Sequence, residues 1–113
     1  MAEVRDVFVT EVSLKSLVLG VYTPRISVDM RYVDELSEDM RVNGQYKPII
    51  CVLHPENPDK CIVVDGEYRV RAARKLGWDT IRAELRKLSE EEAYRLALAI
   101  NEMHGKRLDP VEE

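Results

Sequence analysis

Apolar residues recur along the chain at intervals that predict strands alternating with helices. Two runs rich in isoleucine and valine, "KPIICVL" and "KCIVVDG", are separated by the turn-forming sequence "PENPD" and should pair as neighbouring strands. The segment "TIRAELRKL" has an apolar residue at every second position, as a half-buried strand does. Near the amino terminus, "DVFVTEVSLKSLVLG" suggests a short edge strand, a polar turn and a Leu/Val segment that ends at Gly20.

Two internal stretches have the period of an amphipathic helix. In "RYVDELSEDMRVNG", three apolar residues fall at helical spacing: Val33, Leu36 and Met40. Gly44 is expected to end this helix in the left-handed conformation. A second helix is predicted over about residues 67 to 76, and it should end at Gly77.

A last helix is predicted in "SEEEAYRLALAINEMHG". Ser89 is followed three residues later by Glu92, which is the pattern of a capping box. The apolar face of this helix consists of Ala93, Leu96, Ala97 and Ile100. The predicted order is therefore strand, helix, strand, strand, helix, strand, helix, which indicates an α+β fold with a small mixed β-sheet flanked by helices.

Length and charge narrow the class of protein. The chain has 113 residues, of which 45% are hydrophobic, so residues 1–113 are predicted to form a single domain. The net charge of -4 argues against an extended DNA-binding surface, so any DNA-binding site should lie in another domain or in a local patch. Because no long apolar segment or signal peptide is visible, we expect a cytoplasmic protein without membrane contact.

Two cysteines, Cys51 and Cys61, lie in separate apolar runs without the spacing of a zinc site. We interpret them as buried thiols in neighbouring strands. A cross-strand disulfide is the alternative, because intracellular proteins of hyperthermophiles contain such bonds. The high charge content and the single glutamine, Gln45, favour a thermophilic or archaeal source.

Candidate chemistry is concentrated in "CIVVDGEYRVRAARKLG", where a strand leads through an Asp-Gly corner into a helix. The first turn of a helix has unpaired backbone N–H groups and the positive end of the helix dipole. Such a corner is a natural cradle for an anion. Gly66 would let a ligand approach the backbone closely.

Arg69 is the most informative residue of this corner. At about 100° per residue, it lies on the same stripe as Ala72, Ala73 and Leu76, which the helix must bury. A cation there is costly unless an anion meets it, and that anion is either a carboxylate of the protein or a phosphate of a ligand. Three further cations are expected on the opposite, solvated face: Arg71, Arg74 and Lys75.

The string "DGEYRVRAARKLG" resembles the GERRxRA box of the ParB amino-terminal domain. Three other strings follow in the order of that family: "VYTPR" resembles "NPyQPR", "NGQYKPIICV" resembles "hGviQPIvV", and "LALAINEMHGKRLDPVEE" resembles "aliENLqReDLnPiEEA". The resemblance spans residues 10–113 and points to the superfamily that also contains sulfiredoxin and an archaeal free-serine kinase. It implies one ParB-like nucleotide-binding domain, either stand-alone or the first domain of a longer chain.

The resemblance also implies a ligand, which is CTP with magnesium, bound with its triphosphate on the corner. The implied nucleotide contacts are Asp65, Gly66, Glu67, Tyr68, Arg69, Arg71 and Asn101. Tyr68 stands where the family has its first arginine, so one charged phosphate clamp is missing. The family's Glu-Asn pair, implicated in magnesium binding and hydrolysis, appears reversed as Asn101 and Glu102, and Gly105 replaces an arginine.

Two functions follow from these features. The first is a nucleotide-binding module of a DNA partition or transcriptional regulatory protein, homodimeric, reaching DNA through another domain or subunit, with weak nucleotide triphosphatase activity at most. The alternative is a small-molecule kinase that resembles the free-serine kinase and uses ADP or ATP with magnesium. Glu102 and Asp65 would then be catalytic, with Glu67 as a further carboxylate. Sulfiredoxin chemistry is excluded because Glu67 occupies the position of its cysteine.

Overall fold

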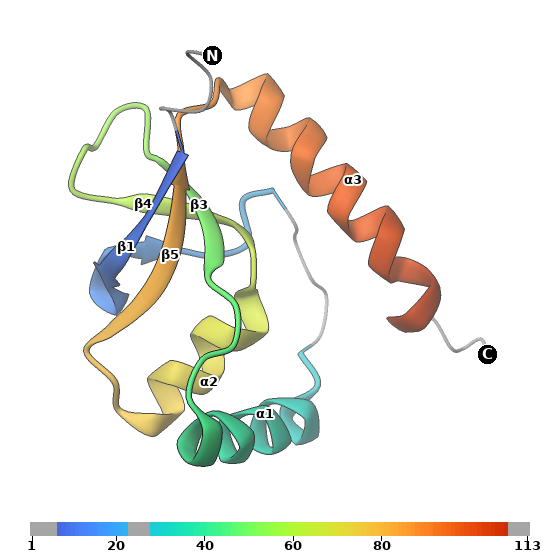
Figure 1. The fold of residues 1–113 in the computed structure, drawn as a ribbon. Coiled ribbons are helices and arrows are strands. Elements are labelled where there is room, and N and C mark those ends of the chain that lie inside the picture. Colours follow the sequence, from blue (N-terminus) through green and yellow to red (C-terminus); the bar gives the residue numbers. More distant parts are fainter. Residues whose placement is uncertain (1–6, 23–27, 109–113) are drawn as a thin grey trace.

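The computed structural model describes residues 7–22 and 28–108 of the chain, with the side chains of residues 8–22 and 28–100. Five strands form one sheet, and helices lie along both of its sides (Figure 1). In chain order the elements are β1 (Val7–Ser13), the 3-10 helix η2 (Leu14–Ser16), β2 (Leu17–Val18), α1 (Met30–Asn43), β3 (Ile49–Leu53), β4 (Cys61–Asp65), α2 (Glu67–Leu76), β5 (Thr80–Arg86) and α3 (Glu90–Leu108).

The sheet is mixed, and its strands are ordered β1-β5-β3-β4-β2. β1 pairs antiparallel with β5, and β3 pairs antiparallel with β4. The remaining pairs, β3 with β5 and β2 with β4, are parallel. The predicted α+β fold with a small mixed sheet is confirmed. The predicted polar turn is the 3-10 helix η2, and the Leu/Val segment that ends at Gly20 contains the two-residue strand β2.

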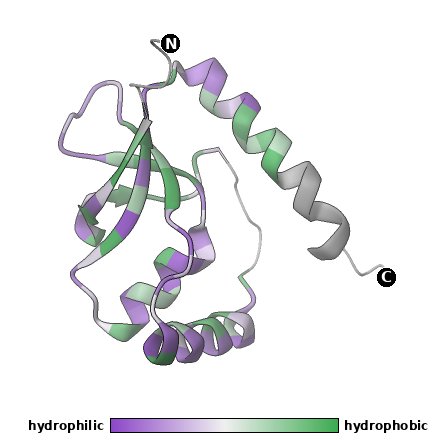
Figure 2. Cartoon of the chain, in the orientation of Figure 1, coloured by the Kyte–Doolittle hydropathy of each residue, from purple (hydrophilic) through white to green (hydrophobic). Residues whose placement is uncertain are grey.

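Each face of the sheet has its own hydrophobic cluster. The cluster on the side of α1 and α2 includes Leu14, Leu17, Met40, Ile49, Cys51, Cys61, Val63, Val70, Ala72, Ala73, Ile81 and Ala83. The cluster on the side of α3 consists of Tyr22, Val52, Ile62, Val64, Ala93 and Ala97. Figure 2 shows the hydrophobic colour concentrated on the strands, whereas the first turns of α3 are hydrophilic. The central strands are therefore apolar on both faces because helices cover both.

The capping box of the last helix is confirmed. The Ser89 N–H donates to Glu92 Oε1 at 2.9 Å, and the Glu92 N–H donates to Ser89 Oγ at 3.1 Å. Two backbone donors that would lack partners in the helix are satisfied reciprocally in this way. Ala93 and Ala97, which were predicted on the apolar face, are fully buried against the sheet.

The two predicted helix ends differ in backbone conformation. Gly77 is left-handed, with φ 79° and ψ 21°, as expected for a residue that ends a helix. Gly44 also has a positive φ of 81°, but its ψ is -169°, so the prediction of a left-handed stop there was wrong. Its N–H still donates to the Met40 carbonyl at 2.8 Å, and the chain then leaves α1 in an extended direction toward β3.

Cys51 and Cys61 are both buried, and both are free thiols. Cys51 pairs with Val63 and Cys61 with Leu53 across β3 and β4, so the two thiols are diagonal neighbours on one face of the sheet. The interpretation as buried thiols is confirmed, and the disulfide alternative is not realised. Burial, and to a smaller extent the neighbouring Cys61, raises the pKa of the Cys51 thiol to about 12.

We predict that Cys51 resists alkylation in the native protein. At pH 8 a thiol with that pKa holds about a thousandfold less thiolate than an ordinary cysteine, and the thiolate is the reactive form. Mass spectrometry after iodoacetamide treatment should show Cys51 unmodified in buffer and alkylated in concentrated urea. Equal rates in the two conditions would contradict the burial of this thiol.

Gly66 joins β4 to α2 through a contact that only glycine permits. Its φ of 108° lies in the left-handed region. A Cβ built on Gly66 would lie 2.6 Å from Ile49 Cγ2 and 2.9 Å from Ile49 Cβ, whereas nothing lies within 4 Å of a Cβ built on Gly77. A glycine is therefore required at position 66, first of all because the corner packs closely against Ile49 of β3.

The two left-handed glycines of α2 form a matched test of this contact. Gly77→Ala should cost about 1–2 kcal/mol of unfolding free energy, from backbone strain alone. Gly66→Ala should cost a further 1–3 kcal/mol or so, because the new methyl group overpacks Ile49. Urea unfolding of both variants measures the difference, and equal losses would show that Ile49 accommodates the methyl group without cost.

Candidate functional site

The corner at residues 65–69 lies where β4 passes into α2 (Figure 1). Asp65 ends β4 opposite Ile50, and Gly66 precedes the first residue of α2. The N–H of Val70 donates to the Gly66 carbonyl at 3.0 Å, which is the first hydrogen bond of the helix. Gly66, the residue before this helix, has no side chain that could cap it, whereas Asp29 caps α1 and Ser89 caps α3. The positive end of the α2 dipole therefore receives no cap from its own N-cap residue.

Glu67 is directed into the protein. The residue is 5% exposed, and its Oε2 accepts a hydrogen bond of 2.7 Å from the Gly20 N–H. A carboxylate is favourable in the first turn of a helix, where the dipole is positive. The contact ties α2 to the chain that follows β2. Glu67, one of the predicted nucleotide contacts, therefore holds the corner in place through a partner 47 residues away.

Tyr68 connects the corner to α1. Its hydroxyl oxygen accepts a hydrogen bond of 3.0 Å from the N–H of Asp29, the residue that caps α1. Its ring meets that of Tyr32 edge-on, with the centroids 4.9 Å apart and the planes at 88°. Edge-on contacts of this kind are favourable for aromatic rings. The tyrosine that replaces the family's first arginine thus joins two helices.

Arg69 is half-buried in the first turn of α2. Within the described part of the chain, its side chain has no hydrogen bond and no salt bridge. The alternative in which a protein carboxylate neutralises this arginine therefore finds no partner among the described residues. The guanidinium is available to an anion from outside the chain.

Arg74 and Lys75 are exposed, as predicted for the solvated face of α2. Their charged ends nevertheless have partners in the protein. The Arg74 Nη2 donates to the carbonyls of Leu14 and Leu17 at 3.1 and 3.2 Å, which satisfies acceptors around η2. The Lys75 Nζ lies 2.8 Å from Asp34 Oδ1 and joins α2 to α1. These cations hold neighbouring elements against α2.

Arg71 is directed away from Arg69. Two residues along a helix correspond to a rotation of about 200°, so the two side chains leave α2 on opposite sides. Arg71 is half-buried and lines a cleft between α1 and α2 together with Met30 and Val33. The predicted contact set therefore divides: Asp65, Gly66 and Arg69 lie at or beside the corner, whereas Arg71 lies in this cleft.

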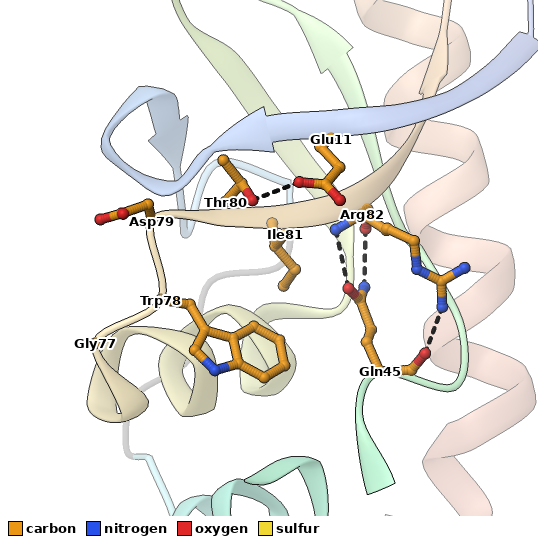
Figure 3. A pocket seen from close by; sticks show the side chains of 8 residues that line it. All are labelled: Glu11, Gln45, Gly77, Trp78, Asp79, Thr80, Ile81 and Arg82. Carbon is orange, nitrogen blue, oxygen red and sulfur yellow. Dashed lines mark hydrogen bonds between the residues drawn. The ribbon is translucent and has the colours of Figure 1, made fainter.

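A second hollow of about 480 Å³ lies at the other end of α2 (Figure 3). Gln45 binds the backbone of β5 there: its Nε2 donates to the Arg82 carbonyl at 2.8 Å, and the Arg82 N–H donates to its Oε1 at 2.9 Å. Thr80 donates to Glu11 at 2.6 Å. Figure 3 shows the Gln45–Arg82 bonds beside the Trp78 ring and the separate Thr80–Glu11 bond on the strands above it. They fasten the loop before β3, and β1, to β5, which no sequence pattern indicated.

Two predicted site residues lie outside the described side chains. Asn101 and Glu102, the candidates for magnesium and for catalysis, lie in α3 beyond residue 100, where the structure describes the backbone but not the side chains. Among the side chains that the structure describes, no three His, Cys, Asp or Glu residues gather closely enough to hold a metal ion. None of the described helices combines the length and apolar character needed to cross a bilayer.

Residues 2–102 match the family model for the ParB N-terminal domain. The chain is 32% identical over 105 residues to a nucleoid occlusion protein of Bacillus cereus, a match that covers 93% of this chain and 35% of that protein. It therefore spans about a third of the length of this curated relative.

Solved structures show the same fold. Truncated ParB from Caulobacter crescentus, complexed with CTP-gamma-S, has a TM-score of 0.75 and 24% identity over 83% of this chain and 52% of its own. Sulfiredoxin from Arabidopsis thaliana has a TM-score of 0.63 and 30% identity over 80% of this chain and 97% of its own. A free serine kinase in complex with ADP has a TM-score of 0.58 and 18% identity, and the match covers 68% of this chain and 30% of the kinase.

We predict that Glu67→Gln lowers stability by about 1–2 kcal/mol, because a charge-assisted hydrogen bond to Gly20 becomes a neutral one. Glu91→Gln is the matched control, since Glu91 and its partner Arg95 are 71% and 73% exposed and such pairs contribute little. Urea unfolding should show the control within about 0.5 kcal/mol of the parent. If both variants lose the same stability, Glu67 has no special part in holding the corner.

Proposed function

The chain belongs to the family of ParB N-terminal domains, and from this premise we propose that it is a nucleotide-binding module of the CTP type in a DNA partition, nucleoid occlusion or transcriptional regulatory protein. The observation that carries the proposal is Arg69, a half-buried arginine without a protein partner in the described part of the chain. It stands in the first turn of a helix whose N-cap residue is a glycine, which has no side chain to cap the helix. Phosphate oxygens meet both requirements, because they pair with guanidinium groups and with helix N-termini.

The residues of the corner would have different roles in nucleotide binding. Gly66 brings the backbone to the phosphates, and Arg69 binds a phosphate oxygen. Glu67 and Tyr68 shape the corner through Gly20 and Asp29. We keep Asp65, at the end of β4, as a contact from this side. Arg71 lies on the other side of α2, so we leave it out of the triphosphate site.

Magnesium and hydrolysis remain part of the proposal through the resemblance. Asn101 and Glu102 would bind Mg²⁺ next to the phosphates, since oxygen ligands suit this ion. Magnesium would neutralise phosphate charge and so supply the electrostatic part of a slow triphosphatase reaction.

The bound nucleotide would act as a switch in a larger protein. A ligand shifts a conformational equilibrium only by its differential affinity for two states. We propose that the nucleotide favours one association state of a homodimer, and that DNA is bound through another domain or subunit. The length of the named relatives, about three times that of this chain, leaves room for such a domain in them. The acidic net charge of -4 fits a module whose DNA contacts lie elsewhere, and we propose a cytoplasmic location.

A small-molecule kinase is the second candidate. It is supported by the likeness in fold to a free serine kinase in complex with ADP and by Asp65, a carboxylate next to the phosphate corner. In that case ADP or ATP would be the ligand, and Asp65 and Glu102 would be catalytic. A kinase consumes nucleotide only when a hydroxyl compound is present, whereas a switch turns nucleotide over slowly without one.

We predict that Arg69→Ala weakens nucleotide binding at least tenfold while the fold survives, because one charge-assisted contact to phosphate is lost. Calorimetric titration with CTP, ATP, ADP and GTP, each with magnesium, measures the effect and the base preference. Arg95→Ala is the control, since it also removes one arginine, from an exposed pair on α3. Circular dichroism verifies the fold of both variants.

Preference for CTP would support the partition-type module, and preference for ADP or ATP would support the kinase. Unchanged affinity of Arg69→Ala would overturn the phosphate role of this arginine. Substitution of Gly66 is no substitute for this test, because any Cβ there collides with Ile49 and disturbs the fold itself.

A further inference from the structure

β1 forms one edge of the sheet, and no other described strand pairs with its outer side. It is seven residues long, whereas β2, at the opposite edge, has only two residues. An edge strand presents a row of unpaired N–H and C=O groups to any other extended chain. At about 3.4 Å per residue, β1 offers roughly 24 Å of such an edge. Of the two edges, β1 is therefore the one that can accept a further strand.

The features that usually protect an edge strand are missing from β1. Proteins discourage edge pairing with proline, with lysine or with a β-bulge. The strand has the sequence "VFVTEVS", without proline or lysine, and it pairs with β5 in an unbroken register. Its one charged residue, Glu11, accepts a hydrogen bond of 2.6 Å from Thr80 and is thereby directed toward β5 (Figure 3). The free edge is therefore open to pairing.

Two large apolar residues of β1 are exposed, one on each face of the sheet. Phe8 is 56% exposed and Val9 is 54% exposed. Phe8 lies beside Leu85 of β5, on the face that α1 and α2 cover. Val12 lies on the same face and packs against the hydrophobic cluster there. A strand added along this edge would cover Phe8 and extend that apolar face by one strand.

We propose that β1 pairs antiparallel with β1 of a second copy of this chain, around a two-fold axis at Thr10. In this register Thr10 faces its own counterpart, and Phe8 faces Val12 of the second copy. Threonine pairs and aromatic–β-branched pairs are both favourable across strands. Val9 faces Glu11 of the second copy, so the two glutamates are diagonal rather than directly opposite, where like charges repel most. The strand is thus complementary to itself, as a two-fold contact requires.

The size of this contact sets its strength. A pair of seven-residue strands buries less than the 1,200 Å² or so of a stable interface, so we expect a dissociation constant between about 1 µM and 1 mM. A contact of this strength becomes effective when other domains or a shared ligand hold two copies close together. The pairing goes beyond the proposed function, because it uses neither a nucleotide nor any residue of the corner.

Sedimentation equilibrium of the 113-residue chain without nucleotide, over about 10 µM to 1 mM, tests the pairing. We expect a reversible monomer–dimer equilibrium. Thr10→Lys and Thr10→Glu should each weaken the dimer about tenfold, because two like charges then lie directly opposite each other at the axis. An equimolar mixture of these two variants should restore association, because a lysine then faces a glutamate.

Two controls separate this contact from general charge effects and from the nucleotide site. Val42→Lys adds the same charge at a valine of α1 that is 63% exposed, and it should associate like the parent. Arg69→Ala should also associate like the parent, even where it abolishes nucleotide binding. Circular dichroism verifies the fold of each variant.

The pairing is overturned if the dimer is insensitive to both Thr10 variants, or if their mixture associates no better than either variant alone. A chain that stays monomeric throughout also overturns it, and would leave the edge to an extended segment of another protein. Loss of nucleotide binding without loss of association would bear only on the proposed function.

Discussion

The close contact between Gly66 and Ile49 sets the position of α2, and the candidate site depends on it. Because no Cβ intervenes, the chain turns from β4 into the helix directly against β3, at a distance that a larger residue would not allow. The first turn of α2 is thereby placed so that Glu67 reaches Gly20 and Tyr68 reaches the start of α1. A corner held on three sides in this way presents its N-terminal end in one fixed geometry, which a preorganised anion site requires.

α2 connects much of the domain through side chains on successive turns. Its first turn binds the chain after β2 and the cap of α1, and its last turns bind η2 and the body of α1. These contacts are not equal in energy. The Lys75–Asp34 pair is more than half exposed on both sides and contributes little, whereas the buried Glu67 carboxylate would be costly to leave without its donor. Two arginines of this helix, Arg69 and Arg71, differ from the others because no described residue bonds to their side chains.

Sequence reasoning predicted the local features well, because they follow from periodicity and short-range hydrogen bonding. The capping box at Ser89, the extent of α2 and the burial of both cysteines belong to this class. The contacts made by Glu67 and Arg74 were beyond its reach, since their partners lie 47 and about 60 residues away in the sequence. A helical wheel gives the direction in which a side chain leaves the helix. The wheel does not identify the carbonyl or amide that the side chain contacts.

Because sequence patterns do not identify distant partners, the surroundings of Arg69 and Arg71 could be determined only from the structure. Both belong to one motif and carry the same charge, but they leave α2 on opposite sides and meet different surroundings. Arg69 stands in the first turn of α2, where its charge adds to the positive end of the helix dipole. Arg71 has a shielded Nε in a cleft between helices, where screening by salt is weaker than at the surface. An acidic chain repels polyanions at long range, so any binding of phosphate by this domain would depend on local concentrations of positive charge.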